Sequence, residues 1–302
     1  MEGVMDHTMR ALLSKIGGMD YLVSEFVRVT SQNASPLALK RLVPELAHDA
    51  LTSSGHPVHV QLLGSNPTTM AATAQNAVAA GATHIDLNFG CPAKRVNGHG
   101  GGSFLLQEPT ALFNIVESVR KALPDNILLS AKMRLGYQDE ALFMDNLMAI
   151  EQAGAAKLTI HGRTKKDGYG PPARWEKIRM AQQCSSMEII ANGDIYDLDS
   201  LDRCRDITGC QHFMIGRGSL ANPFIFRELK GGEQGSYDEL FDVMTSYMET
   251  LSEHYDDFAT LGRIKQWSAH LRRQWPIIAD NLKAIRSTQT IGELKQLLTT
   301  IK

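Results

Sequence analysis

Short apolar runs alternate with longer amphipathic stretches between about residue 20 and residue 230. This alternation predicts a parallel β/α protein, in which each buried strand is followed by a helix that covers the sheet. The predicted strands are residues 21–27, 58–63, 84–88, 127–133, 157–161, 188–191 and 213–215. The predicted helices are residues 67–80, 109–122, 140–153, 174–183, 199–206 and 223–229.

Seven strands with their helices are one unit short of an eightfold β/α barrel. The missing unit would be the first, because a helix-like segment at residues 7–16 comes soon after the start of the chain and no strand precedes it. An open, doubly wound sheet is the alternative, but no Gly-x-Gly-x-x-Gly motif follows an early strand. We therefore expect a TIM barrel of the α/β class whose first strand is truncated.

The pattern changes after about Lys230. Glycines at positions 231, 232 and 235 indicate a flexible link, and only helical periodicity remains from Tyr237 onward. The sequence therefore predicts two domains, a catalytic barrel over residues 1–232 and a helical bundle over residues 233–302. Charge is divided within the second domain. Residues 233–257 carry eight acids and no Lys or Arg, whereas residues 261–286 carry six basic residues and one Asp.

Composition narrows the classes of protein further. With 302 residues, 43% hydrophobic composition and a net charge of −2, the chain can bury a full core and does not attract polyanions as a whole. Any binding of nucleic acid must therefore be local. The four cysteines lack Cys-x-x-Cys spacing, and no apolar run approaches the roughly 18 residues of a membrane helix. We expect a cytoplasmic protein without disulfides, metal ligands or a membrane segment.

The carboxyl ends of the predicted strands are unusually polar. In a TIM barrel these ends form the active site. In chain order they carry Gln61, Asn88, Lys132, Arg134 and His161, followed by Asn192, Gly193 and Asp194 and then by Gly216, Arg217 and Gly218. Turn-forming residues alone would suffice to end the strands, so this set of side chains indicates a ligand shared by the whole rim.

The last two polar loops follow the strands at the seventh and eighth positions of the barrel, where backbone N–H groups often bind phosphate. Lys132 is suited to stabilise negative charge on a reduced planar ring, and Gln61 to hydrogen-bond the edge of that ring. Flavin mononucleotide (FMN) meets both demands. On its own, Gly-Arg-Gly around Arg217 is a common turn, and His161 is as often a structural histidine.

A single thiol lies in the segment Asn-Phe-Gly-Cys-Pro at residues 88–92, which ends a predicted strand. A buried cysteine usually behaves as a small hydrophobic residue, but one held between Gly90 and Pro92 on a loop is presented to a ligand. Cys91 is therefore a candidate acid or nucleophile. A nucleophilic role in hydrolysis is the weaker interpretation, because no histidine nearby in the sequence offers a base, although His161 could be near in space.

Five segments together resemble the tRNA-dihydrouridine synthases. They are Asn-Phe-Gly-Cys-Pro at 88–92, Lys-Met-Arg-Leu-Gly at 132–136, Ile-His-Gly-Arg-Thr at 160–164, Ala-Asn-Gly-Asp-Ile at 191–195 and Met-Ile-Gly-Arg-Gly at 214–218. The resemblance covers essentially the whole chain and implies FMN, with NADPH or NADH as the reductant. Residues 24–29 and 263–267 most resemble the bacterial subfamily that is associated with uridine 16 of the tRNA D-loop.

The resemblance also implies a role for each site residue. Cys91 protonates one carbon of the uracil 5,6 double bond after hydride has reached the other, which suits a thiol whose reference pKa is about 8.5. The implied FMN contacts are Met1, Glu2, Gln61, Lys132, His161, Asn192, Gly193, Asp194, Gly216 and Arg217. The implied tRNA contacts are Arg28, Asn88, Arg263, Lys265, His270 and Arg272. We expect a monomer that binds tRNA, although basic residues on a helix are commonly just solvated.

Two other functions remain open. The same barrel could serve a small-molecule pyrimidine reductase, which would not need a basic helical domain. A truncated first strand could instead leave a catalytically impaired protein that only binds tRNA, because a parallel barrel without that strand has an unpaired edge. Reduction of free uracil would indicate the first function, and failure to retain FMN would indicate the second.

Overall fold

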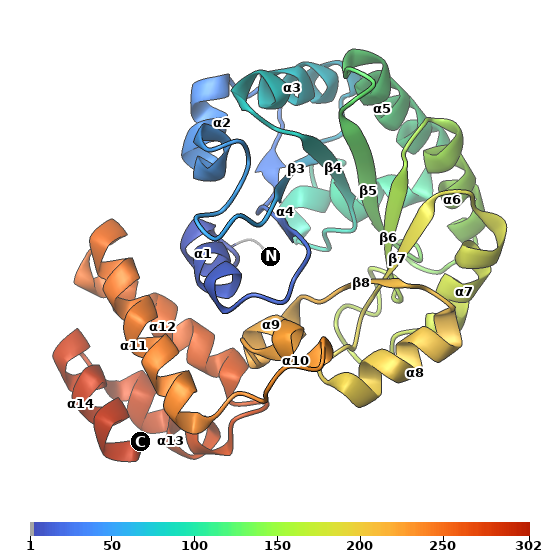
Figure 1. The fold of residues 1–302 in the computed structure, drawn as a ribbon. Helices are drawn as coiled ribbons and strands as arrows, with labels where there is room; N and C mark the ends of the chain where they lie inside the picture. Colours follow the sequence, from blue (N-terminus) through green and yellow to red (C-terminus); the bar gives the residue numbers. More distant parts are fainter. Residues whose placement is uncertain (1–2) are drawn as a thin grey trace.

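The computed structural model describes residues 3–302, and its centre is a sheet of parallel strands (Figure 1). The strands are β1 (Leu22–Val23), β2 (Val27–Arg28), β3 (Val58–Leu63), β4 (His84–Phe89), β5 (Leu128–Arg134), β6 (Lys157–His161), β7 (Glu188–Asn192) and β8 (His212–Met214). Their order along the sheet is β1-β3-β4-β5-β6-β7-β8, and β2 also pairs with β3. Neighbouring strands follow one another in the sequence, so the predicted TIM-barrel class is confirmed.

Helices cover the outside of this sheet. The helices of this part of the chain are α1 (His7–Ile16), α2 (Pro36–Leu42), α3 (Pro67–Ala80), α4 (Lys94–Asn97), α5 (Pro109–Ala122), α6 (Phe143–Gln152), α7 (Trp175–Cys184), α8 (Leu198–Thr208), α9 (Arg217–Ala221) and α10 (Ile225–Leu229), with 3-10 turns η1 (Pro44–Ala47) and η2 (Gly102–Gln107). Figure 1 shows α3, α5, α6, α7 and α8 as an arc around the strands. A proline in the first turn starts both α3 and α5, and both helices match their predicted bounds.

The sheet does not close into a ring within residues 3–302. Strand pairing runs from β1 to β8, and in this part of the chain no pairing joins β8 back to β1 or β2. The open edge lies at the position expected for the first barrel strand. Helix α1 lies beside it and packs against α11 (Tyr237–His254) (Figure 1).

The strand predicted at residues 21–27 is divided into β1 and β2, so its prediction as one continuous strand is wrong. Both short strands pair with β3, β1 with its beginning and β2 with its end. Between them, Ser24 Oγ accepts a hydrogen bond from the backbone N–H of Gln61 at 3.0 Å. A side-chain oxygen thus takes the place of a backbone carbonyl, which satisfies the donor of β3 without a continuous strand.

Side chains alternate between the two faces of each strand. On β4, Ile85 and Leu87 are fully buried in the hydrophobic core beneath the helices. The intervening His84, Asp86 and Asn88 instead hydrogen-bond to side chains of β3 and β5. The outer face of the sheet therefore carries the apolar packing, and the inner face carries polar groups.

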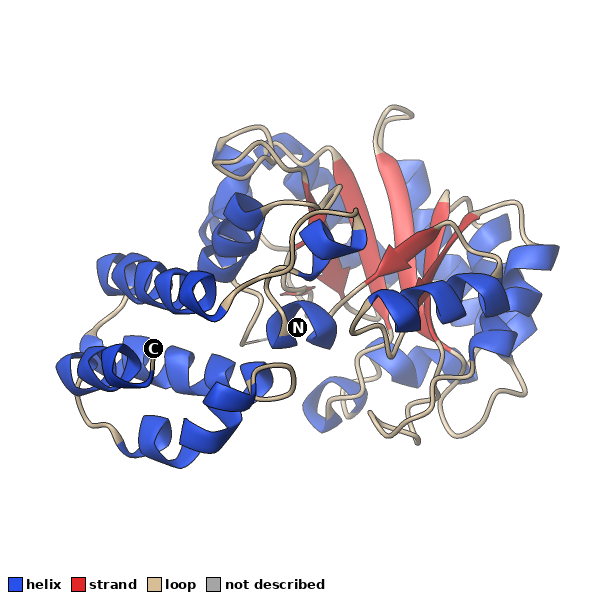
Figure 2. Ribbon diagram, turned by 60° about the horizontal axis from the view of Figure 1, so that its bottom comes forward, coloured by secondary structure: helices blue, strands red, loops and turns tan. Residues whose placement is uncertain are grey.

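Four further helices follow the barrel, α11, α12 (Asp257–Leu271), α13 (Pro276–Ser287) and α14 (Ile291–Ile301). Figure 2 shows them as a helical layer beside the strands. Trp267 of α12 is 1% exposed and lies edge-on to Tyr247 of α11, with 5.3 Å between ring centroids. Its Nε1 donates to the carbonyl oxygen of Leu220 at 3.1 Å, which attaches this layer to α9.

Candidate active site

Gln61 of β3 and Asn88 of β4 form a hydrogen-bonded pair of amides at the carboxyl end of the sheet. Asn88 Nδ2 donates to Gln61 Oε1 at 2.7 Å, and Asn88 Oδ1 accepts from the backbone N–H of Gly90 at 2.9 Å. Gln61 is buried and Asn88 is half-buried. The structure therefore brings these two predicted site residues into direct contact and fixes the direction of both amides.

Cys91 follows this pair on a loop whose backbone is held by three donors. Its carbonyl oxygen accepts from Asn97 Nδ2 at 2.9 Å, from Ser103 Oγ at 2.9 Å and from the Ser103 N–H at 3.1 Å. Gly102 has a φ of +60°, and a Cβ there would lie 2.8 Å from the Cys91 oxygen, so this position requires glycine. These contacts hold the half-buried Cys91 at the end of β4.

Lys132 lies on β5, in register with Asn88 on β4. Burial and the Arg134 guanidinium lower the pKa of Lys132 to about 8, against opposing effects of Asp86 and Cys91. Cys91 follows Asn88 by three residues, just after the end of β4, and Lys132 is the register partner of Asn88. A thiol, an amine and a pair of oriented amides thus meet at one point of the rim, where perturbed ionisation is a mark of functional sites.

His161 ends β6 and is held as a neutral ring. Burial and the positive charges of Lys132, Arg134, Arg163 and Arg217 lower its pKa well below the usual range. Arg163 Nη1 donates to His161 Nε2 at 3.2 Å, and because a guanidinium has only donors, the proton of the neutral ring lies on Nδ1. His161 can therefore donate from Nδ1 to a ligand oxygen without carrying charge.

The loops after β7 and β8 lie next to this histidine. Asn192 Nδ2 donates to the carbonyl oxygen of Met214 at 2.7 Å, which ties the two strand ends together. Gly193 has a φ of +120°, and a Cβ there would lie 3.0 Å from the His161 ring. Asp194 forms an ion pair with Arg163 and lies 3.8 Å from Arg217, the residue after Gly216. The loop after β7 therefore approaches the His161 ring at Gly193, and Asp194 pairs with the arginine that contacts this histidine.

Two of the residues predicted to bind tRNA, Arg263 and Lys265, are engaged in contacts within the protein. Arg263 pairs with Asp6 and lies 4.0 Å above the Tyr255 ring, and Lys265 Nζ donates to a backbone oxygen of α13's carboxyl end at 2.5 Å. His270 is half-buried, with a pKa lowered by burial and by the charges of Arg273 and Arg217, and Arg272 is exposed. Arg28 is half-buried on β2. Met1 and Glu2, the other predicted flavin contacts, lie outside the described residues.

Three residues nearer the amino ends of β4 and β5 support the site, and they were not identified from the sequence. Asp86, Ser130 and His84 are buried on the inner face, below the predicted strand ends. Ser130 Oγ donates to Asp86 Oδ1 at 2.5 Å and contacts His84 Nε2 at 2.9 Å. The available signal is the spacing of two between polar residues on β4 and β5, which indicates a polar inner face.

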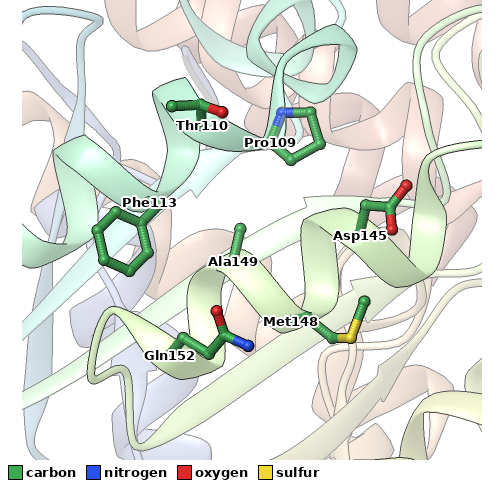
Figure 3. Close-up of a pocket in the computed structure, with 7 residues that line it drawn as sticks. All are labelled: Pro109, Thr110, Phe113, Asp145, Met148, Ala149 and Gln152. Carbon is green, nitrogen blue, oxygen red and sulfur yellow. The ribbon is translucent and has the colours of Figure 1, made fainter.

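A groove on the outer helical layer lies apart from this rim. Figure 3 shows its lining residues along α5 and α6: Pro109, Thr110, Phe113, Asp145, Met148, Ala149 and Gln152. It offers one carboxylate and no partner for acid–base chemistry. Within residues 3–302, no group of three or more His, Cys, Asp or Glu side chains is placed to hold a metal ion, and no helix is long and apolar enough to cross a membrane.

Comparison with known proteins agrees with this geometry. Residues 1–299 match the family described as "Dihydrouridine synthase (Dus)". The chain is 43% identical over 300 residues to a tRNA-dihydrouridine(16) synthase of Shewanella oneidensis, covering 99% of this chain and 95% of that protein. A protein of the same name from Cupriavidus necator is 40% identical over 303 residues, covering 99% and 94%. Among solved structures, histamine dehydrogenase from Rhizobium sp. 4-9 shares the fold, with a TM-score of 0.56 and 15% identity over 80% of this chain and 45% of that one.

Proposed function

We propose, because the chain belongs to the dihydrouridine synthase family, that it is a flavin-dependent enzyme that reduces a uridine of the tRNA D-loop to 5,6-dihydrouridine. The names of its relatives favour uridine 16 as the target. The observation that carries the proposal is the meeting of Cys91, Lys132 and the Gln61–Asn88 amide pair at the carboxyl ends of neighbouring strands.

The residues present suit FMN. Lys132 is a half-buried cation opposite Asn88, whose amide binds Gln61, and Gly193 lies where a Cβ would be 3.0 Å from the His161 ring. We assign Gln61, Lys132 and His161 to the flavin ring and the loops at Asn192–Asp194 and Gly216–Arg217 to its phosphate side. When bound, FMN supplies the hydride, and NADPH or NADH restores it.

Cys91 supplies the proton in this proposal. As hydride reaches one carbon of the uracil 5,6 double bond, the thiol gives its proton to the other carbon, and both hydrogens of dihydrouridine are accounted for. A thiol with a reference pKa of about 8.5 is mostly protonated near neutrality and still gives up its proton readily. Asn88 orients the base, and the charge of Lys132 stabilises negative charge that develops during the transfer.

The tRNA is bound outside the pocket. The target uridine must leave its stack to reach the rim, as in other enzymes that act on bases, so the folded RNA is recognised at other surfaces. We assign residues 233–302 to a tRNA-binding domain, with exposed Arg272 and half-buried His270 among its tRNA contacts. Arg28 is assigned to tRNA orientation. The enzyme is proposed to act as a monomer in the cytoplasm.

The test is turnover by purified protein reconstituted with FMN. With NADPH and an unmodified tRNA transcript, we expect dihydrouridine at position 16, and we expect Cys91→Ala to accept electrons from NADPH while losing dihydrouridine formation. Equal reduction of free uracil would indicate a small-molecule reductase instead. The open edge between β8 and β1 supports a second candidate, a protein that only binds tRNA. Protein that stays colourless and still binds tRNA would establish that candidate.

A further inference from the structure

A chain of hydrogen bonds runs inside the sheet toward the Cys91 loop. Asp86 is 3% exposed, and its Oδ2 accepts from Gln61 Nε2 at 2.7 Å. Gln61 Oε1 in turn accepts from Asn88 Nδ2 at 2.7 Å, and Asn88 Oδ1 accepts from the Gly90 N–H at 2.9 Å. These hydrogen bonds therefore connect a buried carboxylate to the backbone N–H of Gly90, the residue before Cys91.

Both ends of this chain impose the same direction on it. The Gly90 N–H can only donate, so Asn88 must present Oδ1 to it and Nδ2 to Gln61. At the other end Asp86 Oδ2 accepts, so Gln61 must present Nε2 to Asp86 and Oε1 to Asn88. Rotation of either amide would bring two donors or two acceptors together in a buried place, which is costly.

We propose that Asp86 is a positioning residue that holds the Gln61 and Asn88 amides, and through them the Gly90–Cys91 backbone, in the orientation that uridine reduction requires. This inference rests on the proposed function, in which Gln61 contacts the flavin and Asn88 the uracil. Asp86 itself lies below them on β4 and acts only through them.

The partners of the second Asp86 oxygen, Oδ1, determine which substitution at position 86 preserves the hydrogen bonds. Ser130 Oγ donates to Asp86 Oδ1 and contacts His84 Nε2, and the His84 ring stacks on His59 with 3.6 Å between centroids. Burial and Lys157 lower the pKa of His84 to about 4, so the neutral ring can donate or accept at Nε2.

In Asp86→Asn, the new NH2 group can donate to Ser130, whose hydroxyl then donates to His84. The remaining oxygen at position 86 still accepts from Gln61, so the direction of the chain is kept. Asp86→Leu has a similar volume but offers no acceptor. The two variants carry the same charge, so a comparison between them separates the hydrogen bond from any electrostatic effect of Asp86 on Lys132.

The first experiment uses the FMN-loaded enzyme and measures flavin reduction by NADPH separately from flavin reoxidation by a tRNA transcript. We expect Asp86→Leu to slow the tRNA step about 30-fold with KM for tRNA within about 2-fold, since a displaced base and thiol affect the chemical step. Flavin reduction should stay within about 3-fold, and Asp86→Asn should keep both steps within about 3-fold of the wild type. Equal losses in the two variants, or a normal tRNA step in Asp86→Leu, would overturn the proposal.

A second measurement does not need tRNA and holds even if Asp86→Leu fails to fold. Asn88→Asp places acceptors on both sides of Gln61 and should lower the Tm by about 5 °C. Adding Asp86→Asn lets Gln61 turn over, which reverses the two hydrogen bonds that Gln61 makes with positions 86 and 88 while the Gly90 N–H still donates to position 88. This second change should recover at least half of that loss. A double variant no more stable than Asn88→Asp overturns the proposal. A wild-type enzyme that leaves tRNA unmodified refutes the proposed function instead, while the recovery in Tm still decides whether position 86 orients the chain.

Discussion

The buried ion pair between Arg10 and Glu45 attaches α1 to η1. Arg10 Nε and Nη2 donate to the two carboxylate oxygens of Glu45, both at 2.8 Å, and Nη1 donates to the carbonyl oxygen of Met5 at 2.8 Å. The two side chains are 0% and 9% exposed. We expect Arg10→Met to destabilise the protein strongly, because it leaves the Glu45 carboxylate buried without its cation.

The size of this effect follows from burial. Removing one partner of a buried ion pair costs about 3–5 kcal/mol. At about 2–4 °C per kcal/mol for a large domain, the Tm should fall by about 10 °C. Replacing both residues, in Arg10→Met with Glu45→Leu, removes both charges and should recover at least half of the loss, because the cost arises from the unpaired charge and not from the lost attraction.

Thermal and urea unfolding, monitored by circular dichroism, measure the change in Tm and in the free energy of unfolding. The control is Glu117→Gln, which breaks the ion pair between Lys121 and Glu117 on α5, where the side chains are 71% and 37% exposed. This change should cost less than about 0.5 kcal/mol. If Arg10→Met costs less than about 1 kcal/mol, or if the double variant is less stable than the single one, buried charge does not govern this contact.

Three further predictions concern the site. Burial lowers the pKa of Lys132 to about 8, so its positive charge is lost above that pH and kcat/KM for tRNA should fall on the alkaline side. Lys132→Arg stays charged, so its alkaline limb should move to higher pH and report the Cys91 thiol alone, and an unmoved limb would contradict this assignment. Gly102→Ala places a Cβ 2.8 Å from the Cys91 backbone oxygen and should lower kcat about 10-fold. Gly100 has a similar positive φ with no atom within 4 Å of a Cβ, so Gly100→Ala should leave kcat unchanged. Equal losses in the two variants would refute the steric reason. Arg272→Ala should raise KM for tRNA about 3-fold and weaken the salt dependence of KM. Lys121→Ala, on α5, is the control and should change neither. An unchanged salt dependence in Arg272→Ala would show that Arg272 does not contact the RNA.

Local signals predict much of the fold. The bounds of α3 and α5 are correct because each has a proline in its first turn and an apolar stripe of helical period. The bounds of β3 are correct because a run of buried residues ends there at Gly64, where a Cβ would meet Met70 at 2.6 Å. Each of these signals lies within a few residues of the element that it delimits.

The interactions that the sequence does not reveal join distant segments. The division between β1 and β2 depends on a hydrogen bond from Gln61 to Ser24, 37 residues away. Arg263 pairs with Asp6 across 257 residues, so a residue assigned to RNA by its charge is engaged in a contact between α12 and the residue before α1. Charge and residue type alone do not distinguish an arginine that faces solvent from one that is held by a distant carboxylate.

The outer face of the sheet contributes mainly to stability, and the inner face carries the groups proposed for chemistry. The outer face of β3 is fully buried under the helices at Val58, Val60 and Leu62. Apolar burial there supplies much of the folding free energy. The inner face instead holds buried ionisable groups with shifted pKa values: burial raises the pKa of Asp86 and lowers that of Lys132. Substitutions on the inner face that preserve hydrogen bonds should therefore change turnover more than stability, and apolar truncations on the outer face should do the reverse.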